Sequence, residues 1–206
     1  MPITLPNRPG PETLEGLNNK IQYLSDRTPN GLDNYVVKRV SGNTSDATEL
    51  TDPTSLTAFD KTAVLGRGAL LIPGTSFSIY AAGDYRMLVA GTSLQINANL
   101  DATNNLCTFN TLPTLAVTPG ATYRPWTIHI HCIVRTPTSV SAHAVYTVYD
   151  ESTDSRSFTS INSAVSISTG AINQVRILAT FGASNGHKIR LSNLIVEYAE
   201  VIGRRF

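Results

Sequence analysis

Histidines at alternating positions are the nearest approach to a metal-binding pattern in this sequence. His129 and His131 are separated by one residue, and His143 follows in the next strand-like segment. Alternate residues of a strand point to one face and cross-strand neighbours lie close, so the three imidazoles would share a surface. No cysteine or carboxylate completes a zinc-type ligand set. We therefore predict no metal site and interpret these histidines as solvent-facing or interface residues; a histidine cluster at a threefold interface is an alternative.

The carboxylates do not form a pattern that predicts catalysis. Asp84, Asp101, Asp150, Glu151 and Asp154 fall among turn residues, as is typical of polar loops. The sequence has no G-x-S-x-G motif, no P-loop and no G-x-G-x-x-G motif after a strand. We predict that the protein is not an enzyme and needs no cofactor, with a glycan hydrolase as the weaker alternative because carboxylates distant in sequence can pair in space.

Tyrosines are the side chains best suited to hold a sugar ring. An exposed aromatic face beside polar loops can stack on a glycan. The candidate glycan contacts are Tyr80, Tyr85, Tyr123 and Tyr149, although such residues also commonly belong to a core or its rim. The two cysteines, Cys107 and Cys132, lie in strand-like surroundings, and we predict that they are buried thiols.

Charge and hydropathy exclude two classes of partner. Sixteen basic and fifteen acidic side chains give a formal charge of +1, so there is no basic excess to bind nucleic acid. No window approaches the ~20 apolar residues of a membrane span, and the amino end has no signal-peptide-like stretch. We expect a protein made in the cytoplasm and not inserted in a membrane.

The amino-terminal region differs from the rest of the chain. Residues 1–10 contain three prolines and a glycine, which favours an extended arm that docks through Ile3, Leu5 and Pro6. Residues 11–28 predict one short helix. Its apolar residues are spaced three, four and three apart and form a narrow heptad seam: Leu14, Leu17, Ile21 and Leu24. Such a seam fits copies of itself and predicts an oligomer interface; packing against its own domain is the alternative.

From residue 33 to 206 the pattern predicts one all-β domain. Short β-type runs are separated by Gly, Pro, Asn, Asp and Ser clusters, and no second helix is evident. We expect an antiparallel β-sandwich of jelly-roll type, preceded by the arm and the helix. The expected strands are Tyr35–Val40, Ala63–Ile72, Ser76–Ala81, Tyr85–Ala90, Ser93–Ala98, Leu106–Thr111, Leu115–Thr118, Trp126–Arg135, Val140–Tyr149, Phe158–Ile161, Val165–Ser168, Gln174–Phe181 and Lys188–Val201.

Alternation and turn chemistry predict three details of this domain. Trp126 to Val134 alternates apolar and polar residues, and the tight link from Thr136 to Ser139 predicts a hairpin with the next strand. In the last segment the apolar parity changes, which predicts a bulge near Ser192 and Asn193. The residues from Ser41 to Asp60 are expected to form a long surface loop.

The segment from Gly186 to Tyr198 is similar to the closing strand of carbohydrate-binding-module-like jelly rolls. The whole layout, a proline-rich arm, a short heptad helix and a Ser/Thr-rich sandwich, resembles bacteriophage decoration (cement) proteins, head fibres and short tail fibres. The resemblance implies a non-enzymatic homotrimer on the virion surface, docked by its arm on a major capsid or tail protein. The alternative is a receptor-binding module that recognises a host-surface glycan.

Overall fold

The computed structural model describes residues 35–41, 48–65, 73–101, 103–109, 114–167 and 173–201; of 35–41, 48 and 199–201 only the backbone is described. The chain divides into two units, Val37–Glu200 and Met1–Val36 with Val201–Phe206. The predicted arm at 1–10 and the predicted helix at 11–28, with its seam residues, lie outside the described residues. Among the described residues no helix is long and apolar enough to span a membrane.

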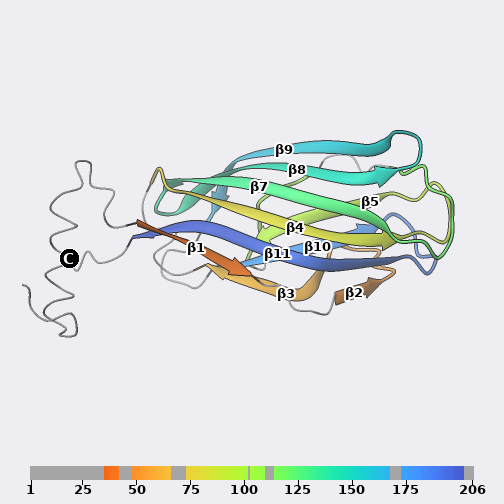
Figure 1. Cartoon of the computed structure of the whole chain (residues 1–206). Helices are drawn as coiled ribbons and strands as arrows, with labels where there is room; N and C mark the ends of the chain where they lie inside the picture. The colour runs from red at the N-terminus through yellow and green to blue at the C-terminus, as the bar shows by residue number, and fades with distance from the viewer. Residues whose placement is uncertain are drawn as a thin grey trace, which may run out of the picture. The chain divides into compact units, whose positions relative to one another are not determined.

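Eleven strands make up the described part of the fold, in two antiparallel sheets (Figure 1). In chain order they are β1 (Tyr35–Ser41), β2 (Thr48–Thr51), β3 (Thr57–Leu65), β4 (Ser76–Arg86), β5 (Leu94–Leu100), β6 (Asn104–Asn105), β7 (Arg124–Thr136), β8 (Ser139–Asp150), β9 (Asp154–Ser166), β10 (Asn173–Phe181) and β11 (Lys188–Val201). The larger sheet has the order β1-β11-β4-β7-β8-β9, and β2 also pairs with β11. The smaller sheet has the order β3-β10-β5-β6.

The two sheets face each other across one apolar core, so the domain is a β-sandwich. Along β7 the burial alternates strictly, and Trp126, Ile128, Ile130, Cys132 and Val134 are the inward residues, as predicted. Residues of the smaller sheet meet them: the Phe59 ring of β3 stacks on Trp126 with centroids 6.4 Å apart. Apolar area removed from water in this way is the main favourable contribution to folding.

Both cysteines belong to this core and are free thiols, as predicted. Burial raises the pKa of Cys107 to about 12 and raises the pKa of Cys132 further. A thiol with so high a pKa carries almost no thiolate at neutral pH and is a poor nucleophile.

The predicted hairpin and bulge are both present. β7 and β8 pair from Trp126 with Val148 to Thr136 with Ser139, and β9 continues the meander on the other side of β8. In β11 the register with β4 shifts between Leu191 and Asn193, which returns the apolar residues to the inner face.

Several predicted boundaries are wrong. The strands expected at Ser76–Ala81 and Tyr85–Ala90 are joined in one strand, β4, which runs through Gly83 and ends at Arg86. A β-carbon on Gly83 would lie 1.9 Å from the Arg190 carbonyl oxygen and 2.8 Å from the Trp126 ring, so glycine here permits close packing inside the sheet.

Other segments merge or change place. The two short strands expected at Phe158–Ile161 and Val165–Ser168 are one strand, β9, and β2 lies within the expected loop from Ser41 to Asp60. Residues 115–118 form no strand; only an isolated bridge joins Ser93 and Thr114.

Candidate interaction surface

The outward face of the larger sheet brings the predicted histidines together. His131 of β7 lies directly opposite Ser78 of β4 on one side and His143 of β8 on the other. Ile161 of β9 continues the row beyond His143. His129 lies in the neighbouring row, between Tyr80 of β4 and Val145 of β8. Residues that occupy directly opposite positions share a face, so these side chains form one surface.

Two large apolar side chains are exposed on this surface. Ile161 is 78% exposed and Tyr80 is 39% exposed, whereas antiparallel sheets generally turn polar residues to water. The half-buried Val145 and Ile195 extend it. We call the following residues the outward band: Tyr80, His129, His131, His143, Val145, Ile161 and Ile195. Within the band, the Tyr80 ring stacks on the His129 ring, with centroids 4.3 Å apart.

The histidines do not form a metal cluster of the usual size. Among the described residues no group of three or more His, Cys, Asp or Glu side chains converges on one point. His131 and His143 are nevertheless a directly opposed pair, and Nδ1 of His131 lies 3.3 Å from the Ser78 hydroxyl.

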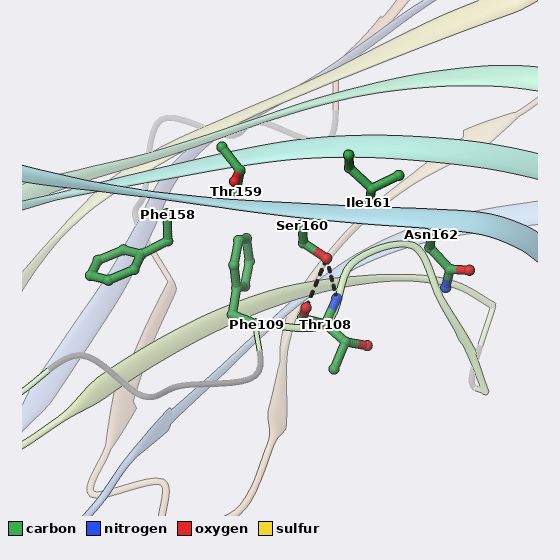
Figure 2. Close-up of a pocket in the computed structure, with 7 residues that line it drawn as sticks. All are labelled: Thr108, Phe109, Phe158, Thr159, Ser160, Ile161 and Asn162. Atoms are coloured by element: carbon green, nitrogen blue, oxygen red, sulfur yellow. Dashed lines mark hydrogen bonds between the residues drawn. The ribbon is translucent and has the colours of Figure 1, made fainter.

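Beside the band, β9 ends the larger sheet and borders a groove of about 360 Å³ (Figure 2). Phe158, Ser160 and Asn162 point from β9 toward the segment of Thr108 and Phe109 on the groove's other wall, while Thr159 and Ile161 point away (Figure 2). The groove therefore lies where the edges of the two sheets approach each other.

The segment of Thr108 and Phe109 is held against β9 by hydrogen bonds from β9 side chains, and not by backbone pairing between strands. The Ser160 hydroxyl accepts from the Thr108 N–H at 2.9 Å and donates to the Thr108 carbonyl at 2.8 Å. The Asn162 amide donates to the Asn105 carbonyl at 3.0 Å. Within the described residues, no other strand pairs with the open edge of β9, and an unpaired edge can accept another strand.

The predicted glycan-contact tyrosines have four different environments. Tyr85 is fully buried and its hydroxyl donates to the Tyr149 carbonyl at 2.7 Å, so its ring cannot stack on a sugar. Tyr123 lies against two guanidinium groups, Arg190 at 3.8 Å and Arg86 at 5.5 Å from the ring centroid. Tyr80 belongs to the outward band. The structure thus does not gather the four tyrosines into one site.

Tyr149 lines a separate hollow of about 160 Å³ on the outward face. The other lining residues are Pro125, Trp126, Thr127 and Thr147 of β7 and β8, and Asp154 and Ser155 at the start of β9. The surface of the hollow is mostly apolar, and the residues around it include a tyrosine, whose ring could stack on a sugar.

The charged side chains beside Tyr123 pair with one another. Glu49 pairs with Lys188, and its other oxygen accepts from Arg190 Nε and the Tyr123 hydroxyl, each at 2.9 Å. The hydrogen bond from Lys188 lowers the pKa of Glu49 most, partial burial opposes it, and the net pKa is about 2. The carboxylate is therefore ionised under all physiological conditions.

Two of the carboxylates considered for catalysis, Asp150 and Glu151, hold loops in place. Asp150 is buried, accepts from the Ser152 hydroxyl and N–H and the Ala116 N–H, and lies 3.4 Å from the Arg156 guanidinium. Desolvation raises the pKa of Asp150, but these partners outweigh it and the net pKa is lowered. Glu151 pairs with Arg124 at 2.6 Å. Both groups are anionic acceptors at neutral pH and are poorly suited to donate a proton as a general acid.

Sequence reasoning missed two features of this surface. The sequence predicted a strand at Ile161 but not whether this side chain points inward or outward. Ile161 is three residues after Phe158, so the two side chains point to opposite faces, and Ile161 is an apolar residue on the outer face. Sequence reasoning also missed the contacts of Asp52, whose carboxylate accepts hydrogen bonds from the Ser184 hydroxyl and from the N–H groups of residues 185–187. The signal for Asp52 is weak, because its partners are more than 130 residues away in the chain.

No family model and no curated protein matches this sequence. Solved structures that resemble the fold include the PL-14 alginate lyase from Aplysia kurodai, with 7% identity over 73% of this chain and 82% of the lyase and a TM-score of 0.40. The CBM2 module of the evolved Dit protein of Lactobacillus casei BL23 phage J-1 has 9% identity over 86% of this chain and 94% of the module, with a TM-score of 0.36.

A chain of the infectious bursal disease virus Gx strain has 12% identity over 84% of this chain, with a TM-score of 0.34. This chain spans 33% of that viral chain. The neighbours thus include a phage module, a viral protein and a polysaccharide lyase. Identities and TM-scores of this size establish neither a shared family nor a shared function.

Proposed function

We propose that this protein is a non-enzymatic structural component of a virus particle, a homotrimer of jelly-roll sandwiches docked on a capsid or tail protein by residues 1–10. The observation that supports it best is the outward band, an apolar and imidazole surface next to an open sheet edge. Exposed apolar and aromatic side chains that lie together on a sheet can form a surface for protein association. The sandwich is then a building block, and the band is where copies of it meet.

The edge strand supports the same proposal. β9 is 13 residues long and contains no proline or lysine, the residues that natural edge strands commonly use to prevent pairing. Ile161 lies near its centre and is 78% exposed. Full burial of an isoleucine side chain contributes ~1.5–3 kcal/mol, so covering this residue contributes about 1–2 kcal/mol per copy.

The amino-terminal residues complete the proposal. The seam of Leu14, Leu17, Ile21 and Leu24 would join the helices of neighbouring copies, and the arm with Ile3, Leu5 and Pro6 would bind the particle. Three weak arms on one rigid trimer bind far more tightly than a single arm, because the second and third contacts are intramolecular.

Sedimentation velocity of the purified chain at micromolar concentration tests the assembly. We expect a trimer, and we expect Ile161→Asp to weaken it because a charge would be buried in the interface. Ser157→Asp is the matched control, since Ser157 is exposed on the same face of the same strand, away from the band. A monomeric wild type, or equal association of both variants, would contradict the role given to the band.

Deletion of residues 1–10 tests the docking step separately. We expect the shortened chain to remain trimeric but to lose association with particles, measured by co-sedimentation. Decoration of particles at wild-type occupancy by the shortened chain would show that the arm does not dock.

A second candidate function, recognition of a host-surface glycan, is favoured by the Tyr149 hollow. A saccharide ring could stack on Tyr149 while its hydroxyls bond to Thr127, Thr147 and Asp154. A glycan array tests this directly. Tyr149→Ala should abolish any binding, whereas Tyr123→Ala should retain it, because the Tyr123 ring is already occupied by arginine side chains.

A further inference from the structure

His131 and His143 are directly opposed across β7 and β8, a placement from which two imidazoles could share one metal ion. The two residues are Cα partners in the antiparallel register of β7 and β8. Opposed side chains on one face have β-carbons ~4.5–5.5 Å apart, a separation from which two imidazoles can reach the same ion. Both side chains are exposed, so an ion can approach from solvent.

Ser78 orients one of the two rings. Its hydroxyl lies 3.3 Å from His131 Nδ1 and can accept the Nδ1–H. The proton is then held on Nδ1, and Nε2 keeps its lone pair for a metal ion. Metal-binding histidines generally make such a contact with their second nitrogen, because it fixes the tautomer and the orientation of the ring.

We propose that His131 and His143 together bind one divalent transition-metal ion, of the Zn²⁺, Ni²⁺ or Cu²⁺ class that imidazole ligands suit. Water fills the remaining coordination positions, since no third protein ligand converges on the pair among the described residues. The site needs residues of one chain only. It goes beyond the structural role proposed above. Both imidazoles belong to the outward band, which the proposed trimer would cover, so the site is tested in the assembled chain and in a variant designed to weaken association.

His129 is a matched control within the same strand. It is exposed and points to the same face, but the residues opposite it are Tyr80 and Val145, so it has no directly opposed imidazole. Its ring also stacks on Tyr80. Replacement of His129 removes one surface imidazole without touching the pair.

Calorimetric titration of the full chain with ZnCl₂ tests the site. We expect one ion per chain. His131→Ala and His143→Ala should each lower the affinity by at least about tenfold. Ser78→Ala should lower it by about tenfold, as is typical when a residue that hydrogen-bonds to a metal ligand is removed. His129→Ala should stay within about twofold of the wild type, because it removes no ligand of the pair.

Electron paramagnetic resonance with CuCl₂ gives an independent readout. The wild type should show two nitrogen ligands, and His143→Ala should show one. The titration is repeated on Ile161→Ser, which keeps both imidazoles, adds no carboxylate opposite His143 and removes the apolar side chain of the outward band, while sedimentation reports assembly in parallel. No binding by either protein, or equal affinity of His129→Ala and His143→Ala, would overturn the site whatever the state of assembly.

Discussion

The contacts of Asp52 give a prediction whose size can be worked out from the structure. One carboxylate oxygen accepts from the N–H groups of Asn185 and His187 at 3.1 and 2.6 Å. The other accepts from the Gly186 N–H at 2.6 Å and the Ser184 hydroxyl at 3.2 Å. The carboxylate thereby holds the loop between β10 and β11 in place.

Asp52→Asn should destabilise the domain by about 2 kcal/mol. The amide keeps one acceptor oxygen, but its NH₂ group faces the two donors that the second carboxylate oxygen accepted from. Two charge-assisted hydrogen bonds are therefore lost. Each contributes ~1.5–3 kcal/mol when buried, and less here because the carboxylate is partly exposed to solvent. The backbone is not strained by the change, because asparagine tolerates the φ of 47° at this position. Urea unfolding should show a lower midpoint with an unchanged m-value.

Asp154→Asn is the matched control for this variant. Asp154 also has a positive φ, of 61°, and its carboxylate makes no hydrogen bond with the described residues. It should stay within ~0.5 kcal/mol of the wild type, as surface substitutions usually do. If Asp52→Asn unfolds at the same urea concentration as Asp154→Asn, the carboxylate does not hold the loop as argued.

The pH dependence of the same group has a definite sign. Desolvation raises the pKa of Asp52, but the hydrogen bonds from the three N–H groups and the Ser184 hydroxyl outweigh it, so the folded-state pKa is lowered. The stability from Asp52 is therefore present above the unfolded value of about 3.9 and is lost as pH falls through the folded pKa. Asp52→Asn should lose this part of the acid transition.

Three further predictions concern the sheet, the edge and a buried imidazole. Gly83→Ala should cost about 3 kcal/mol or more in urea unfolding, because its β-carbon would meet a backbone carbonyl of β11; an unchanged midpoint would contradict the close packing. Ser160→Ala should cost about 1 kcal/mol and expose the Thr108 amide to hydrogen exchange; full protection would show that other contacts hold that wall. His187 is buried, and burial lowers its folded-state pKa although the Asp52 charge opposes this, so its contribution is complete above about pH 6.5 and is lost as pH falls below it. Thermal midpoints should fall over that range in the wild type and less steeply in His187→Asn.

The prediction of an antiparallel, all-β domain depends on local information that the sequence carries. The alternation from Trp126 to Val134 identifies the inner face of β7 because successive side chains of a strand must point to opposite sides. The same rule predicts the bulge after Leu191, since a change of parity would otherwise turn apolar residues outward. Burial of both thiols is predicted by their strand-like neighbours.

Strand pairing could not be predicted where the two paired strands are far apart in the sequence. Gly83 resembles a turn residue locally, and only the approach of Trp126 and the β11 backbone shows why glycine stands there. The short β2 exists because β11 offers it an edge, an influence that no local window contains.

The sequence by itself determined which residues of β7 turn inward, because alternation is a local property of an extended chain. It also placed His129, His131 and His143 on one face. Only the tertiary structure decided that His131 opposes His143 while His129 opposes Tyr80 and Val145, because cross-strand register depends on how separate strands align. The same alignment buried Tyr85, left Ile161 exposed at the edge, and so determined which side chains are available to a partner.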